Sequence, residues 1–144
     1  MISIAALATV TALAAAPPPP KCPGDNTIEI NDCMSATLTK AQGDLDRYLA
    51  AARKRLKSEA ADDAGAAAAL SDLDKVQAAW VAYSKADCDA VYDNWSAGTI
   101  RTAMALTCEI NLTRQRTHTV WGEWLTYMDS TPPILPEPST APAP

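Results

Sequence analysis

Apolar residues recur at alternating steps of four and three along the first third of the chain, the spacing that places side chains on one face of an α-helix. The stripe consists of Met34, Leu38, Ala41, Leu45, Tyr48, Ala52 and Leu56. Asn26 or Thr27 is suited to cap this helix, because a short polar side chain can accept hydrogen bonds from the first free backbone amides. The pattern therefore predicts a long amphipathic helix from Thr27 to Glu59.

A second periodic segment follows a connection rich in alanine and aspartate, and we expect it to start between Gly65 and Ser71. Its apolar face drifts along Leu70, Leu73, Val76 or Gln77, Trp80, Tyr83 or Ser84, Asp87 or Cys88, Val91 and Trp95. Gly98 is suited to the left-handed conformation that ends many helices. Thr99 can cap the helix that follows.

A third helix is predicted from about Thr99 to Met128, with apolar residues on a broad face. Such a face is typical of a helix packed against two neighbours. No segment alternates between apolar and polar residues for long enough to require a strand. The predicted fold is therefore all-α, a three-helix antiparallel bundle cross-linked by two disulfides, with proline-rich disordered ends.

The two ends of the chain differ in composition from the predicted helices. Residues 1–16 carry no charged side chain and end in small residues, as a signal peptide does. Residues 17–21 form a proline-rich spacer, and residues 22–129 form the folded domain. Six prolines follow Thr131, so we expect residues 130–144 to be a disordered tail. No later stretch reaches the ~20 apolar residues of a membrane span, and the mature protein is expected to be periplasmic or secreted.

Export favours disulfides between the four cysteines, which allow three pairings. Cys88 and Cys108 lie ten residues on either side of Gly98. In an antiparallel hairpin of two helices, both sulfurs therefore lie about 15 Å from the turn. This geometry favours Cys88–Cys108 with Cys22–Cys33, while Cys22–Cys108 with Cys33–Cys88 stays open. The absence of a Cys-x-x-Cys pair argues against zinc and against thioredoxin-like redox chemistry.

The formal net charge of −5 argues against a nucleic-acid partner, and the charges are unevenly distributed. Residues 40–57 carry six basic and two acidic side chains, whereas residues 58–98 carry eight acidic and two basic ones. One interpretation is weak attraction between neighbouring helices. The other is an acidic face that steers a basic protein partner.

Candidate catalytic groups are sparse. His118 is the single histidine and has no nucleophile in a recognisable motif, and the five glycines form no phosphate-binding loop. Asp89 and Asp93 share a helix face, a spacing that is common on solvated helices. We therefore expect no enzyme activity, no cofactor and no metal. Among the four tryptophans, Trp80 is expected in the core, and Trp95, Trp121 and Trp124 either cover the core or the tail or anchor a partner.

Several motifs together resemble the LprI-type lysozyme-inhibitor family. Gln77-Ala-Ala-Trp80-Val-Ala-Tyr83 followed by Asp87-Cys88 is similar to its Gln-x-x-Trp-x-x-Tyr-Arg-x-x-x-Cys signature. Ser96-Ala-Gly98-Thr-Ile100 is similar to its inter-helix turn, and Cys108 with Leu112-Thr113-Arg-Gln-Arg116 to its closing motif. Asn31-Asp-Cys33 and Asp44-Leu45-Asp-Arg-Tyr48 are similar to two earlier motifs. Two positions depart from the pattern: Ser84 replaces the usual arginine, and Asp46 replaces asparagine.

The resemblance implies an exported, disulfide-bonded helical domain of the bacterial envelope and, as for some members of the family, binding and inhibition of lysozyme. The hypothesis from the sequence is a non-covalent, inhibitor-like protein whose acidic second helix contacts a basic muramidase. The predicted contact residues are Asp87, Asp89, Asp93, Trp95 and Arg116. Arg114 or Arg116 is also placed to pair with Asp87 across the hairpin. The alternative is an accessory envelope module that binds another protein through its tryptophans and proline-rich ends.

Overall fold

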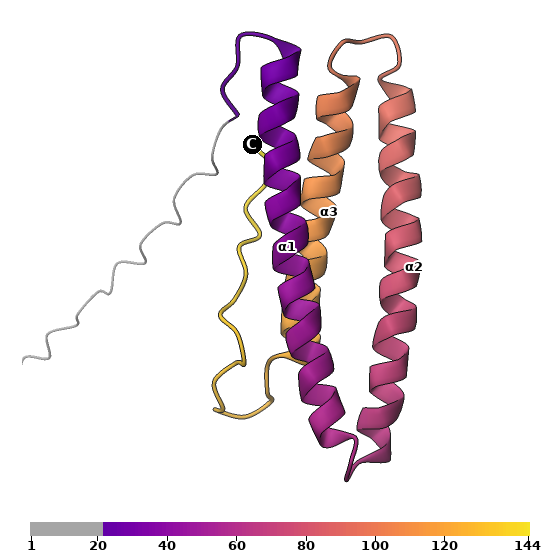
Figure 1. Cartoon of the computed structure of the whole chain (residues 1–144), viewed down its shortest axis with the longest axis vertical. Coiled ribbons are helices and arrows are strands. Elements are labelled where there is room, and N and C mark those ends of the chain that lie inside the picture. Colours follow the sequence, from indigo (N-terminus) through magenta and orange to yellow (C-terminus); the bar gives the residue numbers. More distant parts are fainter. Residues whose placement is uncertain (1–21) are drawn as a thin grey trace, which may run out of the picture.

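The computed structural model describes residues 22–144, and over this range it contains three helices and no strand. The helices are α1 (Thr27–Glu59), α2 (Ala64–Asn94) and α3 (Arg101–Trp124), and they pack as an antiparallel bundle (Figure 1). The predicted all-α bundle with two disulfides is confirmed. The predicted signal peptide, residues 1–16, and the spacer, residues 17–21, lie outside the described residues.

α1 forms where its apolar stripe predicted it. The Asn26 side chain accepts hydrogen bonds from the backbone amides of Ile28 (3.0 Å) and Glu29 (3.1 Å), so it satisfies donors that the first turn leaves free. All seven residues of the predicted stripe are buried, together with Leu49. The amphipathic pattern therefore determined both the extent and the orientation of this helix.

The ends of α2 and α3 differ from the prediction. α2 begins at Ala64, ahead of the predicted range, because the Asp63 carboxylate caps it by accepting a hydrogen bond from the Gly65 amide (2.7 Å). No glycine among residues 22–144 has the left-handed conformation expected at Gly98. The turn between the helices instead contains a hydrogen bond from the Gly98 amide to the Trp95 carbonyl (2.8 Å). α3 starts without a side-chain cap and ends at Trp124, before the predicted Met128.

α2 is the least buried of the three helices. The sequence left two inward faces open, and the structure selects the more polar one. Ser84 (9% exposed) and Cys88 (3% exposed) are buried, whereas Val76 (49%) and Tyr83 (56%) are exposed. A polar inward face limits how closely α2 can pack on α1, since polar groups buried without partners are costly.

The core consists of two apolar clusters at different heights in the bundle. The larger one contains Leu45, Tyr48, Leu49, Ala52, Leu56, Leu73, Val120 and Leu125. The smaller one contains Met34, Leu38 and Ile110, from α1 and α3 only. α2 therefore contributes to the first cluster and not to the second.

Both disulfides lie toward the end of the bundle where α1 starts and the turn between α2 and α3 is found (Figure 1). Cys22 pairs with Cys33 and Cys88 pairs with Cys108, with Cα–Cα distances of 5.5 Å and 5.6 Å. The pairing favoured by the equal distances from Gly98 is confirmed. The two cross-links strengthen the end of the bundle that has the smaller apolar cluster.

The proline-rich tail follows a defined path, in contrast to the disorder expected for residues 130–144. It forms no helix or strand, as its prolines predicted, but it returns along α1 and α3 toward the start of α1 (Figure 1). Tyr48 donates a hydrogen bond to the Pro136 carbonyl (2.7 Å), and the Trp121 indole donates one to the Leu135 carbonyl (2.9 Å). Side chains of the bundle thus donate hydrogen bonds to backbone carbonyls of the tail, which itself forms no strand.

Candidate functional site

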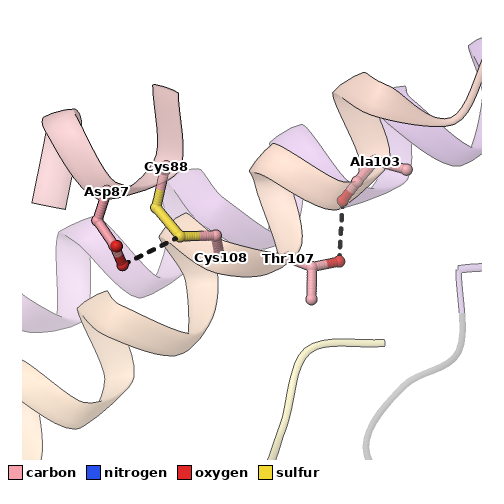
Figure 2. Close-up of a disulfide and its surroundings, with 5 residues drawn as sticks. All are labelled: Asp87, Cys88, Ala103, Thr107 and Cys108. Atoms are coloured by element: carbon pink, nitrogen blue, oxygen red, sulfur yellow. Dashed lines mark hydrogen bonds between the residues drawn. A yellow bond between two sulfur atoms is a disulfide. The ribbon is translucent and has the colours of Figure 1, made fainter. Parts of the chain in front are cut away.

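The Cys88–Cys108 disulfide fixes the position of the acidic end of α2. The Asp87 Oδ2 atom lies 3.9 Å from the Cys108 sulfur (Figure 2). Because both sulfurs are in the disulfide, neither carries a proton, and this approach is a contact and not a hydrogen bond. Thr107 directly precedes Cys108, and its hydroxyl donates to the Ala103 carbonyl (2.8 Å) one turn earlier in α3. The Asp87 carboxylate is exposed beside the disulfide.

The predicted acidic contact residues are all exposed, but they do not form one patch. Asp89 and Asp93 are four residues apart and share a face of α2, whereas Asp87 and Asp89 are two residues apart and point to different sides. Asp89 forms an ion pair with Lys85. Within the described chain, Asp87 and Asp93 have no ion pair. The structure therefore divides the predicted set into two surfaces.

A groove opens where α1 and α2 diverge, and we call it the open groove. It has a volume of about 550 Å³, and no residue of the tail lines it. Its lining residues are Gln42, Leu45 and Asp46 of α1, Gln77, Trp80, Val81, Ser84, Lys85 and Asp89 of α2, and Glu109 and Thr113 of α3. Three carboxylates and one ammonium group give this groove an acidic lining.

Residues from three of the motifs that carry the family resemblance line the open groove. Gln77, Trp80 and Ser84 belong to the signature of α2, and Thr113 belongs to the closing motif of α3. Asp46 comes from the motif in α1. Ser84 is the position where the family pattern has arginine, and its small buried side chain leaves space in the groove. Motifs that are far apart in the sequence therefore form one surface.

Glu109 is a groove residue that the sequence reasoning missed. Partial burial raises the pKa of its carboxyl group, Asp89 raises this pKa further, and Lys85 lowers it. The signal was present in the sequence, because Glu109 follows Cys108 directly. Pairing Cys108 with Cys88 places the next residue of α3 near the segment of α2 that contains Lys85 and Asp89.

Arg116 occupies a different environment from the one predicted. It is only 7% exposed, and its Nε donates to the Gln77 Oε1 atom (3.0 Å). Burial lowers the pKa of its guanidinium group, while Glu123 acts in the opposite direction. Neither Arg114 nor Arg116 pairs with Asp87, since Arg114 donates to carbonyls of the tail. Arg116 therefore supports a groove residue from inside the bundle.

The tryptophans also divide between the predicted roles. Trp80 packs against the larger core cluster, as expected. Trp121 and Trp124 pack on the same cluster, and Trp121 also binds the tail. Trp95 caps the end of α2 and is 39% exposed. Trp95, which belongs to the predicted contact set, is therefore the most exposed of the four tryptophans.

Two properties of residues 22–144 bear on other kinds of site. Over this range, no three His, Cys, Asp or Glu side chains come together as they do around a metal ion. None of the helices in the same part of the chain is long and apolar enough to cross a membrane.

Comparison with known proteins identifies one family. No curated protein and no solved structure matches the chain. The model of the family described as lysozyme inhibitor LprI matches residues 21–119, which include all four cysteines and every motif residue of the open groove. The match ends before the tail and covers more than half of the chain. The protein therefore belongs to the lysozyme inhibitor LprI family.

Proposed function

We propose that this protein is exported and inhibits a lysozyme by binding it without a covalent step. The observation that carries the proposal is the match to the lysozyme inhibitor LprI family across residues 21–119. The two disulfides support export, because such bonds persist in oxidising compartments. The uncharged segment of residues 1–16 supports it as well. A periplasmic or secreted location follows from this proposal.

The proposed contact surface is the open groove together with the adjoining face of α2. Asp89 and Asp93 are exposed on this face, and Glu109 and Asp46 line the groove beside it. Lys85 is the single basic residue of the lining. A basic lysozyme would be attracted to this surface, since complementary charges accelerate encounter and fix orientation.

Trp95 and Arg116 have different roles in the proposal. Trp95 lies at the end of α2, two residues beyond Asp93, and its partly exposed side chain offers apolar area at that end of the helix. Arg116 does not touch the partner. It holds Gln77, which lines the groove, through the 3.0 Å hydrogen bond to its amide oxygen.

A cell-wall clearing assay with purified lysozyme and the mature protein tests the proposal. We expect inhibition that saturates in the micromolar range and weakens at high salt, because salt screens exposed charges over about 10 Å at 0.1 M. A lysozyme that keeps full activity in a micromolar excess of the protein would contradict the proposal.

Variants locate the contact surface. Asp89→Asn with Asp93→Asn removes two charges beside the groove, and we expect it to weaken inhibition about tenfold at low salt. Asp62→Asn with Asp72→Asn removes the same charge from exposed positions of the α1–α2 connection and the start of α2. This control should inhibit like the wild type. Equal effects of the two pairs would show that net charge, and not this surface, determines binding.

The alternative of an accessory module that binds through tryptophans and proline-rich ends has less support. Trp121 and the proline-rich tail contact each other, so neither surface is free in the intact chain. The open groove and the exposed carboxylates remain accessible, and they fit the inhibitor proposal better.

A further inference from the structure

The tail lies in a groove between α1 and α3, which we call the tail groove. Four residues of α3 provide one side of it, namely Asn111, Arg114, His118 and Trp121. Their spacing of three, four and three residues places them on one face of the helix. This stripe lies partly beyond residue 119, where the family match ends, as does the whole tail. No residue of the stripe lines the open groove, so the tail groove is distinct from the proposed inhibitory surface.

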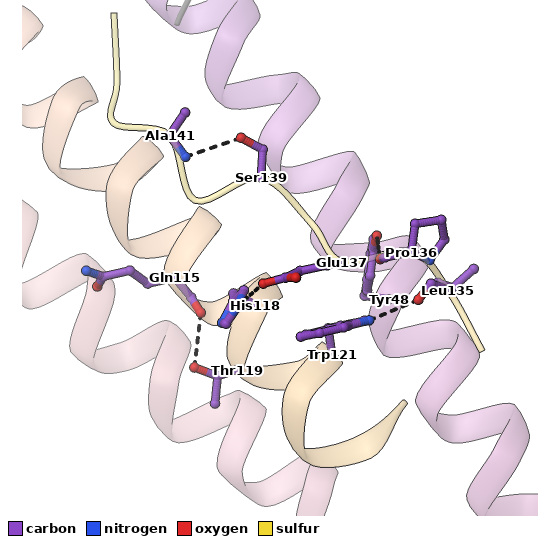
Figure 3. Close-up of polar contacts among 10 residues, drawn as sticks. All are labelled: Tyr48, Gln115, His118, Thr119, Trp121, Leu135, Pro136, Glu137, Ser139 and Ala141. Atoms are coloured by element: carbon purple, nitrogen blue, oxygen red, sulfur yellow. Dashed lines mark hydrogen bonds and ion pairs between the residues drawn. The ribbon is translucent and has the colours of Figure 1, made fainter. Parts of the chain in front are cut away.

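The stripe contacts the tail in reverse order, so the tail runs antiparallel to α3. Trp121 donates to the Leu135 carbonyl (2.9 Å), and His118 contacts the Glu137 carboxylate (2.9 Å) (Figure 3). Arg114 donates to the carbonyls of Ala141 (2.8 Å) and Pro142 (2.7 Å). Asn111 accepts a hydrogen bond from the Ala143 amide (2.8 Å).

Most of these hydrogen bonds go to the backbone of the tail. On the other side of the groove, Tyr48 of α1 donates to the Pro136 carbonyl (2.7 Å; Figure 3). A proline-rich chain has few backbone donors and cannot pair its carbonyls internally. Side-chain donors from an aromatic and polar surface are the means by which proteins bind such segments. The tail groove therefore has the chemistry of a site for proline-rich peptides.

Two apolar contacts define the ends of the bound segment. Leu135 packs against the larger core cluster, and Ala143 packs against the smaller one. From residue 121 to residue 111, α3 rises about 15 Å, whereas eight residues of extended proline-rich chain reach about 25 Å. The tail therefore bows away from the helices, and a cavity of about 500 Å³ lies beneath it.

We propose that the tail groove is a binding site for proline-rich extended peptides and that residues 131–144 are its resident ligand. The groove binds this segment without requiring the covalent link at Asp129–Ser130. The link raises the effective concentration of the tail to about 1 mM, as short tethers do. A tail that is mostly bound in the intact chain therefore requires a dissociation constant below about 1 mM for the free segment.

Cleavage of the folded full-length protein tests this proposal. A protease site inserted after Asp129 lies in the exposed segment between α3 and the bound part of the tail. After folding and cleavage, a labelled peptide of residues 131–144 is titrated, and exchange with the released fragment is followed by fluorescence anisotropy. We expect saturable binding with a dissociation constant below about 1 mM. The uncut protein should bind the peptide at least tenfold more weakly, because its groove is occupied.

Matched variants separate groove binding from non-specific association. Arg114→Ala removes two hydrogen bonds to the tail, and we expect at least tenfold weaker binding. Arg101 lies at the start of α3, away from the tail, and its guanidinium lies over the ring of Tyr92 in α2. Arg101→Ala should therefore leave binding unchanged. In the peptide, Leu135→Ala should weaken binding, whereas Thr140→Ala should change it less than twofold. No saturable binding at several millimolar peptide, or equal effects of the two arginine variants, would overturn the proposal.

Hydrogen exchange on the uncut protein provides an independent measurement. The amides of Ile134 and Ala143 donate to the Leu125 carbonyl and to the Asn111 side chain. We expect both amides to exchange at least tenfold more slowly than in the free peptide. Arg114→Ala should accelerate exchange at Ala143, and Arg101→Ala should not. Exchange of both amides at the free-peptide rate in the wild type would also overturn the proposal.

Discussion

The two grooves beside α1 differ in what fills them. The tail groove, between α1 and α3, is bounded by both apolar clusters and holds a segment of the same chain. The open groove, between α1 and α2, is lined mostly by polar and charged side chains and contains no segment of the described chain. Apolar surface and hydrogen-bond donors to carbonyls attract a proline-rich segment, whereas an acidic lining does not. The comparison shows how one bundle provides one self-occupied and one accessible surface.

The difference begins with the inward faces of the helices. α3 places Ile110 and Val120 fully in the core, so it packs closely on α1. At the corresponding height α2 places Gln77 and Ser84 inward, and these side chains cannot replace apolar contact. α1 and α2 therefore separate toward the disulfide end. The Cys88–Cys108 bond then holds α2 to α3 where apolar packing is weak.

The largest expected effect concerns the disulfide next to the open groove. Replacing Cys88 and Cys108 with serine should lower the free energy of unfolding by about 3 kcal/mol, because the bond closes a loop across the α2–α3 hairpin. Urea unfolding of the oxidised proteins measures this change. Hydrogen exchange should also accelerate over residues 85–93, beside the open groove, more than in the tail. An unchanged unfolding midpoint would contradict this interpretation.

A matched pair of valines compares the core of the covered side with the lining of the open one. Val120 is fully buried in the larger cluster, whereas Val81 lines the open groove and is 53% exposed. Val120→Ala should cost about 2 kcal/mol through lost contacts and a cavity. Val81→Ala should change the free energy of unfolding by less than about 0.5 kcal/mol. Similar costs for the two variants, measured by urea unfolding, would mean that the open groove is packed after all.

A smaller effect is expected from the hydroxyl that Tyr48 donates to the tail. Tyr48 is 2% exposed, and Tyr48→Phe removes only its hydrogen bond to Pro136. The expected cost is about 1 kcal/mol. Tyr83→Phe, at an exposed position of α2, is the matched control and should be neutral. Thermal unfolding of both variants measures the contribution of the tail contact; a neutral Tyr48→Phe would separate the tail from the stability of the bundle.

The smallest effect concerns Glu109 in the open groove. Burial raises the pKa of this carboxyl group in the folded protein above its unfolded value. As pH rises from the usual glutamate pKa to the raised one, the unfolded chain loses its proton first, so stability falls over this window and is then constant. Glu109→Gln should remove this decline and slightly raise the urea midpoint at neutral pH. Exposed Glu123→Gln is the control. An unchanged pH slope in Glu109→Gln would assign the decline to other groups.

Local features of the chain were readable from the sequence because they depend on neighbours in sequence. The stripe of α1 follows from the helical period, and the Asn26 cap follows from its short polar side chain. The Cys88–Cys108 pairing follows from equal distances to one turn. The motifs of the LprI family were readable in the same way. Of these features, only the disulfide pairing requires an assumption about packing, namely that the two helices form an antiparallel hairpin.

Features that depend on contacts between distant residues were decided by the tertiary structure. Val76 and Gln77 both fit the helical period, and the packing of α2 on α3 placed Gln77 beside Arg116. The composition of the tail predicted disorder, yet its backbone is bound by Tyr48, Arg114 and Trp121, which come from other parts of the chain. The sequence by itself determined the stripe and the cap of α1 and favoured the observed disulfide pairing. Only the packing of α1, α2 and α3 decided which groove is filled and which stays open, because the free energy of each contact depends on both of its partners.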